Sequence, residues 1–234
     1  MVQQLSENGD LCSLIHCMNC LLIAATAREI APFLLHYRHT QKQWSVGMNM
    51  DVLITGIGLT ATSYHLTKQL QLKRPDRVIQ AGVAGCFDKQ IPLGTVLAVR
   101  QDTVADETVI EMKKLKTLFD LKLVPQDQFP YTKGWLLNRS DLLKKSKLPA
   151  AKGISVNQIT TSKAMIGFYK KEFNPVTESM EGAALHYVCL KEKIPFLQIR
   201  SVSNYIGERN KKNWNMNESI FNLNNKLISI TATI

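Results

Sequence analysis

Two glutamates, Glu178 and Glu181, stand between a short polar stretch and a longer apolar one. The apolar stretch predicts a helix from Met180 to about Lys191, with Glu181 in its first turn. Carboxylates at positions i and i+3 of a helix lie side by side, and one that faces a cleft can accept hydrogen bonds from a polyol. The alternative is a carboxylate that only interacts with the positive end of the helix dipole.

Asn204 is a second candidate because it follows a strongly apolar run. That run predicts a buried strand over residues 194–202, and Asn204 comes just after it. Ligands of open α/β sheets bind beyond the carboxyl ends of the strands, so an amide at this point can contact a ligand. The same amide can instead cap the backbone of a turn, and the residues alone leave both interpretations open.

Three further segments place small or polar residues after predicted strands, at residues 25–29, 55–58 and 81–85. Glycines at such points either form tight turns or let a ligand approach the backbone. The chain has no dinucleotide fingerprint, phosphate-binding P-loop, nucleophile elbow or HExxH zinc motif. These segments therefore indicate an edge of the sheet where a ligand can bind, without defining the chemistry.

The elements that must position these residues alternate between short apolar runs and helical patterns, which is typical of a βαβ fold. Predicted strands cover residues 20–25, 50–55, 77–81, 92–100, 153–160, 177–179 and 194–202. Predicted helices cover residues 27–37, 59–72, 180–191 and 215–230. The lysine-rich residues 106–150 predict two short helices with loops. We expect one domain over residues 18–234, preceded by a non-native or disordered extension over residues 1–17.

The cysteines do not predict a metal or redox site. Cys17 and Cys20 have CxxC spacing, with Cys12 and His16 nearby, but no second ligand pair follows at zinc-site spacing. A redox CxxC opens a helix after a strand, whereas this one precedes a strand. The odd total of five cysteines argues against a disulfide framework. We therefore expect no metal in this protein.

Composition and charge narrow the class of protein. With 234 residues, 45% of them hydrophobic, the chain can bury a core, and disordered, collagen-like and membrane-spanning classes are excluded. No secretory signal pattern is present, so we expect a cytoplasmic protein with no membrane partner. The net charge of +10 can attract anions, but the basic clusters lie far apart in the sequence. We therefore expect no nucleic-acid partner.

Several of these segments together resemble the nucleoside phosphorylase/nucleosidase superfamily. The matching residues, in order, are 25–30, 55–58, 82–85, 178–184 and 200–209, followed by Trp214. Within the superfamily, the sequence looks most like the futalosine hydrolases of the alternative menaquinone pathway. The resemblance runs from about Met18 to the C-terminus and is weakest over residues 106–150.

The resemblance implies a three-layer α/β/α sandwich with a mixed, partly barrel-like central sheet, usually as a homodimer. It also implies cleavage of a ribosyl N-glycosidic bond. By position, Glu181 would hold the 2′ and 3′ hydroxyls of the ribose, and Met180 would lie under the sugar. The glycines Gly58, Gly82 and Gly85 would let the backbone approach the sugar and the water.

By the same resemblance, Glu29 would position or activate the attacking water. The match is imperfect here, because methylthioadenosine nucleosidases have two or three consecutive acids where this chain has Arg28 and Glu29. A base that takes a proton from water contributes about 10²–10⁴ in rate. A carboxylate at Glu181 stabilises the cationic, oxocarbenium-like sugar, and this chemistry requires no metal or organic cofactor.

Asn204 and the loop after it bear on the substrate. A 6-oxopurine presents two acceptors, N7 and O6, and an amide group can donate towards both, which favours hypoxanthine or guanine over adenine. Futalosine carries hypoxanthine and a benzoate on its 5′ side. The guanidinium of Arg209 can bind that carboxylate through two hydrogen bonds. Trp214 can line the apolar pocket that holds the benzoate ring.

Four alternatives remain open. The first is another purine nucleosidase, acting on methylthioadenosine, S-adenosylhomocysteine or aminodeoxyfutalosine. The second is a purine nucleoside phosphorylase, which needs a phosphate site built from several arginines. The third is a basic nucleic-acid-binding module, suggested only by the net charge of +10. The fourth is an inactive family member that serves as a dimeric scaffold.

Overall fold

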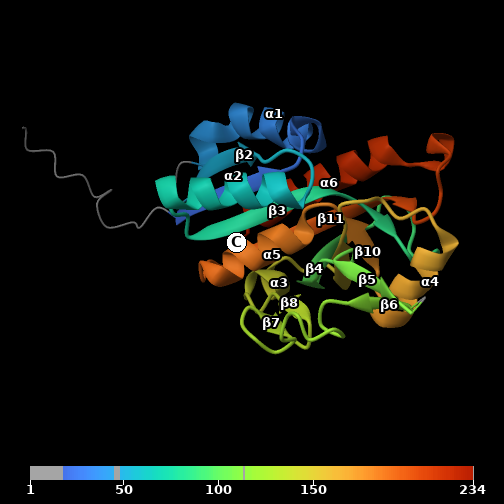
Figure 1. The fold of residues 1–234 in the computed structure, drawn as a ribbon. Helices are drawn as coiled ribbons and strands as arrows, with labels where there is room; N and C mark the ends of the chain where they lie inside the picture. The colour runs from blue at the N-terminus through green and yellow to red at the C-terminus, as the bar shows by residue number, and fades with distance from the viewer. Residues whose placement is uncertain (1–17, 45–47, 113, 234) are drawn as a thin grey trace, which may run out of the picture.

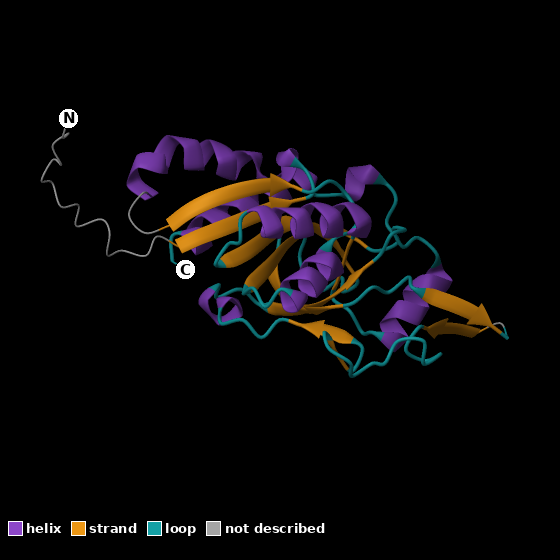
Figure 2. Cartoon of the chain, turned by 60° about the vertical axis from the view of Figure 1, so that its left-hand side comes forward, coloured by secondary structure: helices purple, strands orange, loops and turns teal. Residues whose placement is uncertain are grey.

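The computed structural model describes residues 18–44, 48–112 and 114–233. The predicted extension, residues 1–17, lies outside the described residues together with Cys12, His16 and Cys17. Figure 1 and Figure 2 show a central sheet with helices on both of its faces. None of the helices in the described ranges is both long and apolar enough to cross a membrane.

The described chain holds eleven strands and six α-helices, and the strands β3 to β8 follow one another without a helix between them. The strands are β1 (Met18–Ala24), β2 (Met48–Ile54), β3 (Arg77–Cys86), β4 (Val96–Asp102), β5 (Thr108–Glu111), β6 (Lys114–Thr117), β7 (Tyr131–Thr132), β8 (Trp135–Leu137), β9 (Ala150–Ser155), β10 (Thr177–Ser179) and β11 (Phe196–Tyr205). The helices are α1 (Ala27–Trp44), α2 (Leu59–Leu72), α3 (Leu142–Lys145), α4 (Lys163–Glu172), α5 (Gly182–Lys191) and α6 (Met216–Thr231).

The sheet is mixed and closes on itself. Its strands follow the order β2-β1-β3-β10-β9-β4-β8-β7, and β11 pairs with both β3 and β4. The five strands β3, β10, β9, β4 and β11 therefore form a closed ring, from which β2 and β1 extend as parallel neighbours. This arrangement confirms the expected α/β fold with a mixed, partly barrel-like sheet.

Strand β1 shows why the sheet is covered on both faces. Its side chains alternate between the two faces, as the two-residue period of a strand requires. Leu22 packs with α1 and α6 in one apolar cluster, whereas Leu21 and Ile23 pack with α2 and α5 in another. Both faces of the strand are buried, so its sequence is a continuous apolar run rather than an alternating one.

The interior of the ring is polar where α5 begins. The carboxylate of Asp102 accepts a hydrogen bond from Ser155 Oγ at 2.9 Å, and the backbone N–H of Ala183 donates to the same Ser155 oxygen at 2.8 Å. A Cβ on Gly182 would lie 2.1 Å from Asp102 Oδ2, so only glycine fits at the start of this helix. Burial raises the pKa of Asp102 to about 7 and lowers the pKa of the neighbouring His186 to about 4.

Two strands are longer than the sequence predicts. Residues 82–85 were expected to form a turn after a strand ending at residue 81, but β3 continues through them to Cys86. Similarly, β11 continues past the expected end at residue 202 and includes Asn204. Closure of the ring explains both errors, because each strand pairs along this length with a neighbour that the local sequence does not reveal.

The prediction for residues 106–150 was wrong. This stretch holds one short helix, α3, and four short strands, two of which form the separate hairpin β5–β6. The β-branched residues of 108–110 favour a strand, and Lys116 pairs with Glu111 across the hairpin. Helix α4 was not predicted, because only Tyr169 of its residues is buried and the apolar signal is weak. In contrast, the predicted bounds of α2 are confirmed at both ends.

The buried acid in the ring makes a prediction about stability. Because the folded-state pKa of Asp102 is raised from 3.8 to about 7, the unfolded chain loses this proton first as the pH rises. The contribution of Asp102 to stability is therefore complete below about pH 4 and is lost as the pH rises towards 7. Asp102→Asn cannot ionise, so urea unfolding should show the variant gaining stability relative to the wild type over this range. Parallel pH profiles for the two proteins would contradict the assignment.

Candidate active site

A cavity of about 310 Å³ opens beside the ring where β3, β10 and β11 approach the starts of α1 and α5. Most of its lining is apolar, but three carboxylates contribute to it: Glu29, Glu178 and Glu181. Asn204 lines the same cavity. The structure thus brings the predicted acids and the predicted amide together around one space, although Glu29, the pair Glu178 and Glu181, and Asn204 come from three distant parts of the chain.

Glu181 is held by two partners. One of its oxygens lies 3.3 Å from Arg200 Nη2, and the other accepts a hydrogen bond from the backbone N–H of Gly58 at 3.3 Å. Gly58 has φ +98°, a conformation that favours glycine, where it precedes α2. The helix after Glu181 begins at Gly182, so Glu181 stands just before its first turn rather than in it, and its side chain does not cap the helix.

Arg200 is a functional residue that the sequence analysis missed. It lies in the middle of β11, and its side chain is 2% exposed. Besides Glu181, its guanidinium donates to Gln80 Oε1 at 3.0 Å and to the carbonyl of Val83 at 3.5 Å. The sequence did contain a signal for this residue, namely a cation inside a strongly apolar strand. Such a cation is expected to be buried, and a buried charge requires a partner of opposite charge.

Glu29 accepts three hydrogen bonds. One oxygen receives the backbone N–H and the hydroxyl of Thr26, each at 3.0 Å, and the other receives the backbone N–H of Val83 at 3.1 Å. The contact with Thr26 has the spacing of a capping box, in which the N3 acid satisfies the residue before the helix. The third bond ties the start of α1 to β3, which fixes the carboxylate at the cavity wall. A Cβ on Gly82 would lie 3.0 Å from this carboxylate.

Asn204 is oriented by its neighbours. Ser203 Oγ donates to its side-chain oxygen at 2.9 Å, and its amide nitrogen donates to the carbonyl of Tyr205 at 3.3 Å. Gly85 stands opposite Asn204 on β3, and a Cβ there would lie 3.4 Å from the amide nitrogen. The same Cβ would lie 2.4 Å from Ile206 Cδ1, so the absence of a side chain at Gly85 accommodates Ile206, which lines the cavity beside the amide.

Glu178 does not stand beside Glu181 on one helical turn, as the i, i+3 spacing predicted. It belongs to β10, where its side chain accepts the backbone N–H of Thr160 at 3.0 Å. Its other oxygen is buried without a hydrogen-bond partner. Burial raises the pKa of Glu178, and the hydrogen bonds from Thr160 partly offset that rise.

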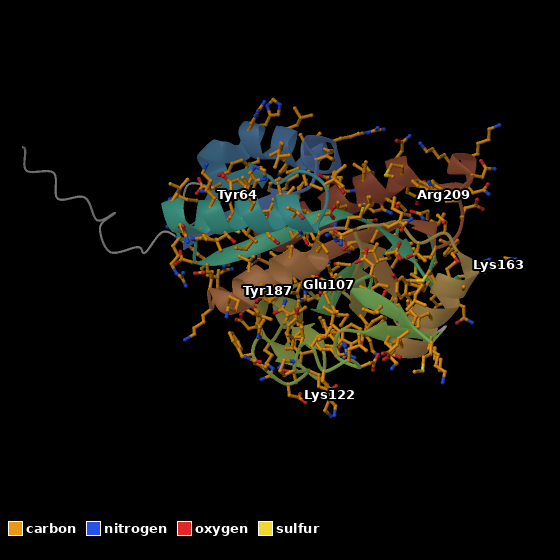
Figure 3. The ribbon with its side chains drawn as sticks, in the orientation of Figure 1. Tyr64, Glu107, Lys122, Lys163, Tyr187 and Arg209 are labelled. Atoms are coloured by element: carbon orange, nitrogen blue, oxygen red, sulfur yellow. The ribbon has the colours of Figure 1, made fainter. Side chains whose placement is uncertain are left out.

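The remaining predicted residues lie in three places. Met180, Gly85 and Trp214 line the cavity. Gly58 and Gly82 lie behind it, where they accommodate Glu181, Arg200 and Glu29. Arg209 is exposed on the loop between β11 and α6 (Figure 3), and its guanidinium carbon lies 5.9 Å from the centre of the Trp214 ring.

Other lining residues were not singled out from the sequence. Arg28 carries the only positive charge among the described residues that line the cavity, and it directly precedes Glu29. Ile159 and Ile206 supply apolar surface near Asn204 and Glu178. The described residues contain no cluster of three or more His, Cys, Asp or Glu able to hold a metal ion.

This arrangement suits a reaction in which a bound group becomes positively charged. Carboxylates placed in an apolar cavity stabilise developing cationic charge more strongly than they would in water. One of them, Glu29, can also accept a proton, and Asn204 offers an amide to a polar edge of a ligand. The apolar remainder of the lining suits a flat base and an apolar substituent.

The sequence profile of the Phosphorylase superfamily matches residues 37–232, so the chain belongs to that family. Among curated relatives, the 5′-methylthioadenosine/S-adenosylhomocysteine nucleosidase of Halalkalibacterium halodurans is 28% identical over 173 residues, which cover 70% of this chain and 71% of the relative. The futalosine hydrolase of Thermus thermophilus is 24% identical over 205 residues, which cover 86% of this chain and 89% of the relative.

Solved structures share the fold. The 5′-methylthioadenosine/S-adenosylhomocysteine nucleosidase of Helicobacter pylori superposes with a TM-score of 0.76 at 19% identity, covering 93% of this chain and 99% of that one. The futalosine hydrolase of the same organism gives a TM-score of 0.75 at 19% identity, covering 92% and 97%. This likeness confirms the architecture that the sequence predicted.

The buried pair makes a prediction that does not depend on the substrate. Arg200→Met leaves Glu181 buried without its cation, so the free energy of unfolding should fall by about 3–5 kcal/mol. Arg200→Met combined with Glu181→Gln removes the orphaned charge and should recover part of that loss. Urea denaturation of the two single variants and the double variant measures the coupling. Additive losses would show that the two side chains do not stabilise each other.

Proposed function

We propose that this protein hydrolyses the N-ribosidic bond of a 5′-modified 6-oxopurine nucleoside and acts as a cytoplasmic homodimer. The substrate that fits best is futalosine, which would yield hypoxanthine and dehypoxanthine futalosine. The observation that carries this proposal is the convergence of Glu29, Glu181 and Asn204 on one cavity. The nucleosidase activity of the curated relatives, which include a futalosine hydrolase, supports it.

Glu181 would act on the sugar. Arg200 and the N–H of Gly58 hold its carboxylate in place. A carboxylate that accepts the 2′ and 3′ hydroxyls orients the ribose and stabilises the positive charge that develops as the glycosidic bond breaks. Met180, adjacent in the chain and also lining the cavity, would lie under the sugar.

Glu29 would act on the water. As the bond from C1′ to N9 breaks, its electron pair moves to the purine, and the hydrogen bond from Asn204 to N7 stabilises the resulting negative charge until N9 takes a proton from solvent. The water oxygen bonds to C1′, and Glu29 accepts the proton that this water loses. The hydrogen bonds from Thr26 and Val83 hold the carboxylate in one orientation, which a positioned base requires.

Asn204 would act on the base. Ser203 donates to its side-chain oxygen and the carbonyl of Tyr205 accepts from its amide nitrogen, which leaves the second amide N–H as the donor that a ligand can meet. N7 and O6 of a 6-oxopurine are both acceptors, so this amide suits hypoxanthine or guanine. The donor also helps the base to leave, because it stabilises the charge that the purine gains.

The lining argues for water rather than phosphate as the second substrate. A phosphorylase must neutralise a phosphate dianion, for which several cations are usual. Of the described lining residues, only Arg28 is cationic, whereas three are carboxylates that repel phosphate. Arg200 is already engaged by Glu181. The same three acids disfavour a nucleic-acid backbone at this cavity, despite the net charge of +10.

A methylthioadenosine/S-adenosylhomocysteine nucleosidase is the second candidate, because several curated relatives carry that name at 23–28% identity. Both candidates share the sugar and water chemistry and differ in the base and the 5′ group. The amide at Asn204 is the feature that favours a 6-oxopurine over an adenine nucleoside.

Exposed apolar side chains support the homodimer. Ile54 at the end of β2, Ile57 in the following turn and Tyr64 on α2 are 39%, 63% and 60% exposed, and Figure 3 labels Tyr64. Strand β2 is an edge of the sheet, and Ile57 also lines the cavity. A second copy that covered this surface would therefore also border the substrate site.

The proposed reaction is tested by measuring hypoxanthine release from futalosine with and without phosphate. Release should be independent of phosphate and faster than base release from aminodeoxyfutalosine or methylthioadenosine. Glu29→Gln should lower kcat by about 10²–10⁴-fold, because an amide cannot accept the water proton. Glu172→Gln, which removes an exposed charge at the end of α4, is the matched control and should leave kcat unchanged. Faster turnover of the 6-amino substrates would contradict the assignment.

The 5′ carboxylate of futalosine gives a second test. Arg209 beside Trp214 is the proposed partner of that carboxylate, and Arg28 is the lining cation for comparison. Arg209→Ala should lower kcat/KM for futalosine about tenfold or more, while inosine, which lacks the benzoate, is barely affected. Steady-state kinetics on both substrates measure the difference. A selective loss in Arg28→Ala and none in Arg209→Ala would contradict this role of Arg209.

A further inference from the structure

Glu178 has no task in the reaction described above, although it lines the same cavity. Its side chain lies on β10 and is about 5% exposed. One oxygen accepts the N–H of Thr160 at 3.0 Å, and Oε2 is buried without a partner. A buried carboxylate oxygen without a hydrogen bond is costly, so its persistence beside a cavity points to a ligand that supplies the donor.

The register of the ring places Glu178 across from Asn204. Both residues stand opposite Gly85, Glu178 on one side of β3 and Asn204 on the other. Opposed residues on neighbouring strands project to the same face of a sheet. Two strand spacings of about 4.8 Å put their Cα atoms about 10 Å apart. Gly85 between them has no side chain, Ile206 packs over it, and the carboxylate and the amide both line the same cavity.

We propose that Glu178 recognises the N1–H of a 6-oxopurine base and thereby selects the base together with Asn204. The inference rests on the proposed function and adds a specificity-determining residue to it. Along one edge, hypoxanthine presents the acceptors N7 and O6 and then the donor N1–H. An amide group of Asn204 meets the acceptors, and the free oxygen of Glu178 meets the donor. A 6-aminopurine instead has an unprotonated N1, whose lone pair faces the carboxylate unfavourably.

The surroundings of Glu178 suit an acceptor. The N–H donated by Thr160 favours the ionised carboxylate, because hydrogen bonding to the charged form stabilises it. Desolvation and the nearby Asp106 act in the opposite direction and raise its pKa. Ile159, which also lines the cavity, keeps this region apolar, and a charge-assisted hydrogen bond is stronger there than in water.

Glu178→Gln tests the inference, because the N–H of Thr160 determines the orientation of the glutamine amide. The amide oxygen continues to accept the Thr160 N–H, so the NH₂ group takes the place of Oε2. The NH₂ group cannot accept a hydrogen bond from the N1–H of hypoxanthine, because both groups are donors. It can donate a hydrogen bond to the unprotonated N1 of an adenine base. The ratio of kcat/KM for futalosine to that for aminodeoxyfutalosine should therefore fall by about 10- to 100-fold. Glu172→Gln, which removes an equal charge outside the cavity, should leave the ratio unchanged.

Calorimetric binding of the free bases provides a readout that does not require turnover. The wild type should bind hypoxanthine at least tenfold more tightly than 1-methylhypoxanthine or adenine, and Glu178→Gln should lose the preference for hypoxanthine over adenine. An unchanged kinetic ratio and an unchanged base preference in Glu178→Gln, with hydrolysis intact, would overturn the inference and leave the proposed function standing. If the wild type releases no base from any nucleoside, the proposed function fails, and base binding alone then decides the role of Glu178.

Discussion

The ion pair between Arg200 and Glu181 constrains much of the site around it. The two side chains are 2% and 7% exposed, so neither charge can be satisfied by bulk water. Gln80 therefore accepts from the arginine, and the N–H of Gly58 donates to the glutamate. Gly82 must lack a side chain, because a Cβ would lie 2.4 Å from the guanidinium. One pair thus links β11, β3 and the starts of α2 and α5.

The three carboxylates of the cavity differ in their partners, and this difference separates their proposed tasks. Glu181 faces a cation, Glu29 receives three neutral donors, and Glu178 receives one backbone N–H from Thr160. Glu181 is therefore held partly by an ion pair, whereas Glu29 and Glu178 are held by hydrogen bonds. The three acids of one cavity thus have different surroundings.

Local signals singled out Glu181 and Asn204 as candidates, because each stands near the end of a regular element, whereas Glu29 was named through the resemblance to the nucleoside phosphorylase/nucleosidase superfamily. The same signals predicted the α/β class and the bounds of α2. They could not predict Arg200 or the separation of Glu178 from Glu181. Those depend on closure of the ring, which extends β3 and β11 through residues that read locally as turns. Pairing between strands distant in sequence is decided by tertiary contacts, which a local pattern does not contain.

The hairpin β5–β6 pairs with no other strand of the described chain, and Figure 2 shows it extending away from the sheet. Ile110 near its tip is 75% exposed. Lengthening or replacing this hairpin would therefore shift the register of no strand that carries a cavity residue. Natural variants can accumulate changes here at little cost to the catalytic geometry. For the same reason, a protein engineer could graft a foreign peptide onto this arm.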